Sequence, residues 1–331
     1  MLPRERTEQL EEQTLCALAA RASQSAGRRI PQDKCPLRTE FQRDRDRIIH
    51  STSFRRLKHK TQVFLIPAGD HYRTRLTHTL EVAQIARTIS RALALNEDLT
   101  EAIALGHDLG HTPFGHAGEQ ELNRLCPDGF RHYEQSLRTV DYIENDGRGL
   151  NLTAEVRDGI LTHTNQTAQT REGRVVRLAD VIGYINHDID DSIRAGVLRE
   201  DDIPADIKAV LGQNKSARIT TLVTAVINHG AADIGMDGQT LAAHEQLHKF
   251  MFESVYRNPL CKSEEVKAKS MIAKLYEHFC ANPDALPADY LRLAERFGKE
   301  RAVCDYVAGM TDGYAISVFE ELFIPKGWSR L

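Results

Sequence analysis

The amino-acid sequence predicts an all-α fold. Apolar residues recur at helical spacing, as in Val82, Ile85, Ile89 and Leu93, whereas stretches with the alternating pattern of a β-strand are scarce. Hydrophobic residues make up 41% and charged residues 27% of the 331 positions, which are ordinary proportions for a folded globular protein. We therefore expect a globular bundle of helices.

The same pattern places the expected helices in order along the chain. The first spans about 43–60, the breakers of the loop IPAGD at 66–70 follow, and a long helix spans about 74–95. Cap-type residues at 96–100 precede a short apolar helix, and glycines and a proline then interrupt regular structure at 107–116, which we call the histidine turn. Further helices are expected near 132–145, 153–163, 175–195, 217–229, 244–256, 262–280, 286–297 and 299–321.

The domain organisation predicted from the sequence is a single domain over residues 1–331. No internal repeat and no low-complexity linker interrupts the chain. Its core is expected at about 40–230, and a polar loop at 230–240 separates it from a C-terminal helical part at about 241–331. The C-terminal part has amphipathic helices suited to packing or assembly, and we assign it no chemistry.

Charge and cysteine usage restrict the class of protein. The formal charge of -4 argues against a nucleic-acid-binding domain, which usually carries a marked basic excess, so nucleic-acid binding is left open but is not predicted. Six scattered cysteines without a C-x-x-C pair are expected to be reduced thiols. No apolar run approaches the roughly 20 residues that span a bilayer, and the N-terminus does not resemble a signal peptide. We expect a cytoplasmic protein without membrane association.

Histidine and aspartate residues indicate a metal site. The histidine turn, HDLGHTPFGH, holds His107, Asp108 and two further histidines after an apolar helix, and His78 and Asp180 add another imidazole and carboxylate. Burying so many polar groups without a ligand would be costly. Mixed nitrogen and oxygen ligands suit Mg, Mn, Fe, Co or Zn, so the sequence predicts a divalent metal without identifying it.

Basic residues indicate where phosphates would bind. Arg75 lies three residues before His78 and so shares its helical face, where a guanidinium can hold phosphate oxygens with two hydrogen bonds. The run RRLKHK at 55–60 lies on a predicted helix, and a charge run is usually a solvated face. We expect Lys58 and at least one of Arg55 and Arg56 on that face.

Four segments carry a resemblance to a known family. They are RDRDRIIHSTSFRRLKHKTQVF at 43–64, GDHYRTRLTHTLEVAQIAR at 69–87, AIALGHDLGHTPFGHAGE at 102–119 and LADVIGYINHDIDD at 178–191. Together they resemble the deoxyguanosinetriphosphate triphosphohydrolase-like branch of the HD superfamily. The resemblance implies an HD-domain helical bundle with additional C-terminal helices.

The resemblance also implies a role for each of twelve residues. The implied metal ligands are His78, His107, Asp108 and Asp180. His116 and Glu119 match a pair that handles protons at the α-phosphate, and His132 matches a histidine near the phosphates. The implied substrate contacts are Arg75 and Arg56 with the triphosphate, Gln62 against the deoxyribose, and Tyr184 and Asp188 with the sugar. The resemblance implies no role for His111. It could support the metal ligands from behind, or it could be purely structural, and both alternatives are left open.

The activity implied by the resemblance is metal-dependent hydrolysis of deoxynucleoside triphosphates to deoxynucleoside and tripolyphosphate. Homo-oligomers, hexameric or built from dimers, are implied as well. The preferred base, the metal and any activating nucleotide are not readable from the sequence. An HD-type phosphatase or phosphodiesterase acting on nucleotides or nucleic-acid ends is the alternative enzyme, and it would not release tripolyphosphate. A dNTP-binding or single-strand nucleic-acid-binding protein with a vestigial site would bind without turnover.

Overall fold

The fold predicted from the sequence is confirmed by the structure, a computed structural model that describes residues 1–62 and 73–326, with only the backbone of 259–263. The regular secondary structure of the described residues is helical, and their only extended pairings are two isolated bridges, Arg28 with Thr153 and Thr61 with Thr74. The predicted loop at 66–70 lies outside the described residues.

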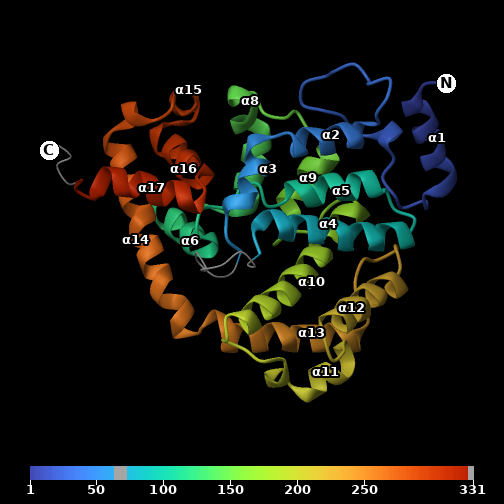
Figure 1. The fold of residues 1–331 in the computed structure, drawn as a ribbon. Coiled ribbons are helices and arrows are strands. Elements are labelled where there is room, and N and C mark those ends of the chain that lie inside the picture. The colour runs from blue at the N-terminus through green and yellow to red at the C-terminus, as the bar shows by residue number, and fades with distance from the viewer. Residues whose placement is uncertain (63–72, 327–331) are drawn as a thin grey trace.

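Most of the helices follow one another with short connections, and a longer irregular segment joins the first two (Figure 1). The first ten are α1 (Pro3–Thr14), α2 (Glu40–Ile49), α3 (Thr52–Arg56), α4 (Arg75–Ala92), α5 (Glu97–Gly106), α6 (Gly115–Leu125), α7 (His132–Arg138), α8 (Glu144–Gly147), α9 (Ala154–Thr162) and α10 (Arg171–Arg194). The others are α11 (Ala205–Leu211), α12 (Lys215–His229), α13 (Gly238–Met251), α14 (Pro259–Ala281), α15 (Ala288–Phe297), α16 (Lys299–Gly309) and α17 (Asp312–Phe323). Short 3₁₀ turns and two π-helical segments, η3 (Thr139–Ile143) and η5 (Phe252–Tyr256), join some of them.

Capping residues explain where the sequence predictions succeeded and where they failed. The long helix near 74–95 is confirmed as α4, which begins after Thr74, whose side chain accepts a hydrogen bond from Thr77 N. The single helix predicted at 43–60 is wrong because Ser51 caps a new helix there, accepting from Phe54 N. The single helix at 299–321 is wrong for the same reason, since Thr311 caps α17. Helices α1, α6 and α11 were not predicted.

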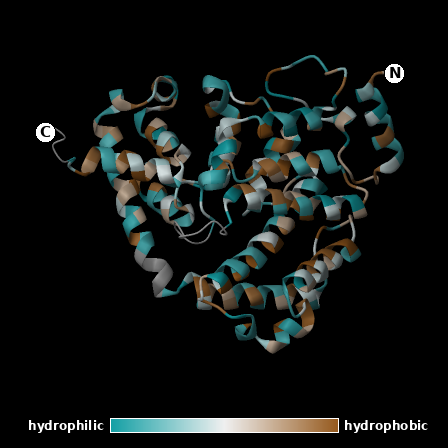
Figure 2. Cartoon of the chain, in the orientation of Figure 1, coloured by the Kyte–Doolittle hydropathy of each residue, from teal (hydrophilic) through white to brown (hydrophobic). Residues whose placement is uncertain are grey.

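Two clusters of buried apolar side chains hold the helices together. The larger one gathers residues of α4, α5, α9, α10, α12 and α13, such as Val82, Ile103 and Ile182, which are fully buried. The second joins α6 to α14, α15, α16 and α17, which lie at the left of Figure 1. Most helices carry both apolar and polar residues, as amphipathic helices do (Figure 2). Helix α6 therefore packs mainly with the C-terminal helices, and the single-domain organisation stays a prediction.

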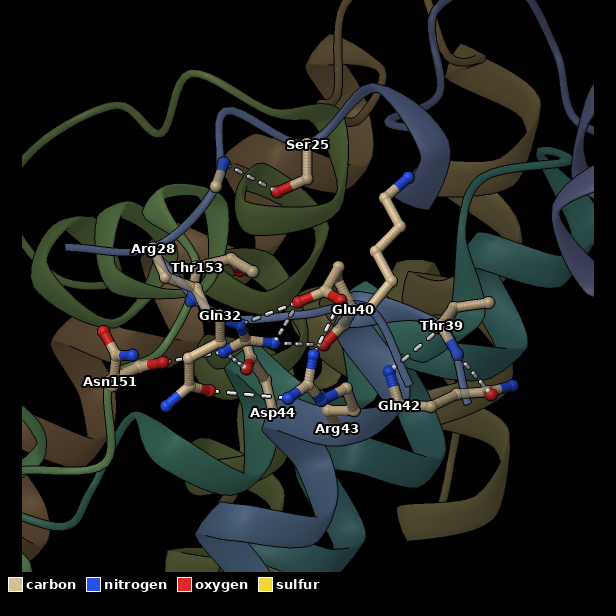
Figure 3. A network of polar contacts seen from close by, with 12 residues as sticks. Ser25, Arg28, Gln32, Thr39, Glu40, Gln42, Arg43, Asp44, Asn151 and Thr153 are labelled. Carbon is tan, nitrogen blue, oxygen red and sulfur yellow. Dashed lines mark hydrogen bonds and ion pairs between the residues drawn. The ribbon is translucent and has the colours of Figure 1, made fainter. Parts of the chain in front are cut away.

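A buried ion-pair network fixes the irregular segment between α1 and α2 to the helical core (Figure 3). The Arg28 side chain is 3% exposed, and it bonds to Glu40 at 2.6 Å and to Asp44. Its guanidinium also donates to Asn151 O at 2.7 Å, and Asp44 accepts from Thr153 N at 2.8 Å. This arginine therefore joins three parts of the chain.

Replacing Arg28 with alanine is expected to lower the free energy of unfolding by about 3–5 kcal/mol, because the buried Asp44 loses its counter-ion and Glu40 keeps only Arg43. Arg38→Ala is the matched control. Arg38 bonds to Asp46 at 2.6 Å, but its side chain is 48% exposed, so we expect a loss of at most about 1 kcal/mol. Urea unfolding measures both variants, and equal losses would contradict this account of the network.

Two further sequence predictions can be compared with the described residues. The cysteines whose side chains are described, which exclude Cys261, are all free thiols. Within residues 1–62 and 73–326, none of the helices combines the length and apolar character needed to span a membrane.

Candidate metal centre and active site

Four side chains meet between α4, α5 and α10. His78 lies on α4, His107 and Asp108 directly follow α5, and Asp180 lies on α10. His78 Nε2 lies 3.1 Å from Asp180 Oδ1 and 3.9 Å from Asp108 Oδ2. His107 Nε2 lies 3.3 Å from Asp108 Oδ1 and 3.7 Å from Asp180 Oδ1. The structure thus brings together all four residues predicted as metal ligands.

The His107 ring shows that the cluster fits a divalent cation. Its Nδ1 lies 2.6 Å from Ala104 O, to which it donates, so the lone pair of Nε2 points into the cluster. Nε2 is buried and has no hydrogen-bond partner among the described residues. Ligand atoms that share an ion at about 2.1 Å lie roughly 3 Å apart, close to the separations found here. A divalent metal would satisfy this nitrogen and both carboxylates.

The two carboxyl groups of the cluster are held ionised. Burial raises the pKa of Asp108, but His107, His111 and Arg75 outweigh it, and the pKa lies well below its usual range. The pKa of Asp180 is likewise lowered to about 2, because the effects of His78 and His107 exceed that of burial. Ionised carboxylates are the form that binds metal.

A glycine allows α7 to approach the histidine turn. Gly110 N donates to Ser136 Oγ at 2.9 Å, and this hydroxyl donates to His107 O at 2.6 Å. A Cβ on Gly110 would lie 2.1 Å from Ser136 N, so only glycine permits the contact. The close approach fixes the backbone between two of the four ligands and His111.

A second group of polar side chains extends from the metal cluster. His111 Nε2 lies 3.0 Å from Asp108 Oδ1, and the His111 ring stacks on His132 with 4.1 Å between centroids. His132 Nδ1 lies 3.0 Å from Glu119 Oε1, which also accepts from His132 N at 2.9 Å. A continuous path therefore leads from a predicted metal ligand to Glu119.

The sequence paired Glu119 with His116, and the structure gives Glu119 a closer partner. His116 Nδ1 lies 3.5 Å from Glu119 Oε2, and the His116 side chain is 78% exposed. Burial raises the pKa of Glu119, but His116 and His132 reverse this and lower it. Glu119 lies between two histidines, one buried against the cluster and one open to incoming molecules.

Arg75 connects the metal cluster with the start of α6. It is 3% exposed, and its Nη1 donates to Asp108 Oδ2 at 3.0 Å. Its Nη2 lies 3.3 Å from the point that a Cβ on Gly115 would occupy, and its Nε is buried without a hydrogen-bond partner in the described chain. Within the described chain the Nε donor of Arg75 is therefore available to a ligand, as a phosphate-binding arginine requires.

Three residues are predicted to contact the sugar. Tyr184 and Asp188 lie on α10, and Gln62 directly precedes the undescribed residues 63–72. Asp188 is buried, its Oδ2 accepts from Tyr256 Oη, and its Oδ1 has no partner among the described residues. Burial raises the pKa of Asp188 to about 7. Tyr184 is half-buried beside the ring of His248, and Gln62 Oε1 is buried without a hydrogen bond to the described chain. Their contacts with a sugar stay predictions.

The basic run at 55–60 divides between exposed residues, a contact with the C-terminal helices and a contact with the histidine turn. Arg56 Nη1 donates to Gly309 O at 3.1 Å, so a described contact joins it to the C-terminal helices, and its contact with a triphosphate stays a prediction. Arg55 and Lys58 are exposed, as expected. Lys60 is buried, which lowers its pKa to about 7, and it donates to His111 O and Ala308 O.

The sequence analysis did not identify a histidine behind the metal cluster. His187 Nδ1 lies 3.3 Å from His78 Nδ1, and His187 Nε2 lies 3.1 Å from Glu81 Oε2. Helical spacing was the available signal, because Glu81 follows His78 by three residues and His187 follows Asp180 by seven. Such partners orient the ring of a metal-binding histidine.

Comparison with known proteins places the chain in a family. Residues 75–184 match the HD domain, and residues 234–321 match the phosphohydrolase-associated domain. A deoxyguanosinetriphosphate triphosphohydrolase-like protein of Caldanaerobacter subterraneus subsp. tengcongensis is 57% identical over 331 residues, covering 99% of this chain and 98% of that protein. Proteins with the same description from Clostridium tetani and Geobacter sulfurreducens are 47% and 39% identical, and each alignment covers 98% of this chain and 97% and 99% of the relative.

The HD match contains all four residues of the metal cluster, and the nearly full-length identity extends through the C-terminal helices. These findings agree with the buried histidine and aspartate geometry of a metal-dependent phosphohydrolase. The chain belongs to the family of deoxyguanosinetriphosphate triphosphohydrolase-like proteins, which carry an HD domain.

Proposed function

We propose that this protein hydrolyses deoxynucleoside triphosphates to deoxynucleoside and tripolyphosphate, using a divalent metal. The proposal rests on the proximity of three groups at one site. Arg75 contacts the cluster of His78, His107, Asp108 and Asp180, and Glu119 with its two histidines lies beside that cluster. The names of the relatives support a deoxynucleotide substrate. Cytoplasmic location and homo-oligomeric assembly accompany this proposal and stay predictions.

The reaction requires water to add to the α-phosphorus while the bond from phosphorus to the 5′ oxygen breaks. A divalent ion held by His78, His107, Asp108 and Asp180 would lower the pKa of water and offset the phosphate charge. Arg75 binds phosphate oxygens through its available Nε donor and stabilises the charge that develops on them.

The exposed His116 is the group that transfers a proton. His116 donates a proton to the departing 5′ oxygen, and Glu119 beside it stabilises the protonated ring. The buried His132 shares Glu119 and holds the carboxylate in place. Gln62 excludes a 2′ hydroxyl, while Asp188 Oδ1 accepts from the 3′ hydroxyl and Tyr184 packs on the sugar ring.

The test is an incubation of the purified protein with Mn or Mg and each dNTP and NTP, singly and mixed, followed by anion-exchange chromatography. We expect tripolyphosphate and deoxynucleoside from dNTPs, and little product from NTPs. The Asp180→Ala protein, purified in parallel, measures contaminating phosphatase.

Each of the other possible outcomes of this test would indicate a different activity. Orthophosphate or pyrophosphate as the product would indicate a phosphatase or phosphodiesterase of the HD class and would contradict the proposal. Tight dNTP or single-strand nucleic-acid binding without turnover in either metal would indicate a binding protein. Turnover only in the dNTP mixture would show that one dNTP activates hydrolysis of another.

A further inference from the structure

The first residue of α17, Asp312, places a buried carboxylate behind the histidine turn. Asp312 is 4% exposed, and its Oδ1 accepts a hydrogen bond from Phe114 N at 3.0 Å. Its Oδ2 accepts from Thr61 N at 3.0 Å and from Thr61 Oγ1 at 2.7 Å. One side chain of the C-terminal helices thus joins the residue before Gln62 to the residue two positions before His116.

The carboxylate of Asp312 does not cap its own helix. Thr311 is the N-cap of α17, and its side chain accepts from Tyr314 N. Both oxygens of Asp312 instead accept hydrogen bonds from segments that are 198 and 251 residues away in the sequence. The first turn of α17 would keep its cap without this carboxylate.

The backbone conformation of Phe114 is strained, so contacts from the rest of the fold must hold it. Its φ of 62° and ψ of 25° are left-handed values that residues with a side chain seldom adopt. Phe114 is also the N-cap of α6 and provides no side-chain hydrogen bond to that helix. His116 and Glu119 lie in the first two turns of α6, so the direction in which α6 leaves Phe114 determines where both side chains point.

A second polar link connects the same parts of the chain. The buried Lys60 donates one hydrogen bond to His111 O in the histidine turn and another, at 3.0 Å, to Ala308 O at the end of α16. The Phe114 side chain is buried in the apolar cluster of the C-terminal helices, with Val303 and Val307. The turn is therefore held from the C-terminal side by polar and apolar contacts together.

We propose that Asp312 is a positioning residue for the hydrolysis, and that it holds the Phe114 backbone so that His116 and Glu119 face the metal cluster. The inference deepens the proposed function and rests on it for its effect on turnover. It gives the C-terminal helices a task at the active site, although their residues contribute no metal ligand to the described cluster.

Asp312→Asn tests this inference with a nearly unchanged side-chain shape. The amide can accept through one oxygen only, so Phe114 N or the Thr61 donors lose a partner. We expect kcat to fall roughly 10- to 100-fold, as for a small misplacement of catalytic groups, with KM and bound metal nearly unchanged. Hydrogen exchange of the Phe114 amide, followed by mass spectrometry, should become about tenfold faster without dNTP.

Thr311→Ala is the matched control, because it removes the cap of α17 one residue away and leaves the Asp312 carboxylate in place. It should keep wild-type kcat and wild-type exchange at residues 112–119. Thr61→Val is a milder second variant, which removes one of the three hydrogen bonds to Asp312. It should lower kcat and speed exchange of the Phe114 amide, each by less than Asp312→Asn does. It decides the question if Asp312→Asn does not fold.

Wild-type kcat and exchange in Asp312→Asn, or in Thr61→Val where Asp312→Asn does not fold, would overturn the inference. An equal loss of kcat in Thr311→Ala would overturn it too, because the effect would then belong to the integrity of α17. A wild-type protein that releases no tripolyphosphate from any dNTP would refute the proposed function instead. The exchange comparison needs no substrate and would still show whether Asp312 holds the turn.

Discussion

His107→Ala is expected to abolish metal binding and to lower phosphohydrolysis at least about 10³-fold, because the Lewis acidity of the bound ion supplies several kcal/mol. The variant removes a buried nitrogen that has no hydrogen-bond partner among the described residues, and it leaves the ionised Asp108 and Asp180 with one histidine ligand fewer beside them. Elemental analysis after dialysis against Mn, combined with product chromatography, measures both effects.

His278→Ala serves as the control for the loss of a histidine. His278 lies on α14, partly buried against Phe279 and Phe323, and is distant in sequence from the metal cluster. It should retain metal and turnover. A full complement of metal in the His107→Ala protein would show that His107 is not a ligand.

His116→Ala should lower kcat by roughly 10²- to 10⁴-fold, the usual contribution of a general acid, while bound metal stays at the wild-type level. The side chain is 78% exposed, so its removal should barely change the melting temperature. This combination separates proton transfer from metal binding, since His107→Ala loses both metal and turnover.

The exposed His59 offers a control for His116, because His59→Ala removes a surface imidazole from η2 (Leu57–His59) outside the site. Turnover equal to wild type in His116→Ala would remove His116 from the mechanism. The proton would then have to come from another group near Glu119, and His132 is the nearest candidate.

The parts of the fold that were predictable are those that local physics determines. Helix α4 combines a regular apolar face with a threonine cap, and both signals are readable in its own sequence. The start of α6 could not be predicted, because it follows a left-handed Phe114 whose conformation is supported by Asp312, 198 residues later. The breaks at Ser51 and Thr311 were readable as capping residues, but continuous apolar spacing favoured a single helix.

Within the site, the family motifs predicted which residues meet and did not predict how they share partners. The resemblance predicted that His78, His107, Asp108 and Asp180 would lie together. The stacking of His111 on His132 and the sharing of Glu119 by two histidines depend on how α6 and α7 pack. No spacing rule within one helix describes contacts between separate helices.

The packing of α6 with the last helices has a consequence for protein synthesis. A ribosome has synthesised all four predicted metal ligands by residue 180, whereas α14, α16 and α17 follow only after residue 258. A truncated or stalled chain therefore contains the ligand residues and lacks the partners that hold α6. Premature termination after residue 180 would yield chains that contain the four predicted metal ligands but lack the helices that pack against α6.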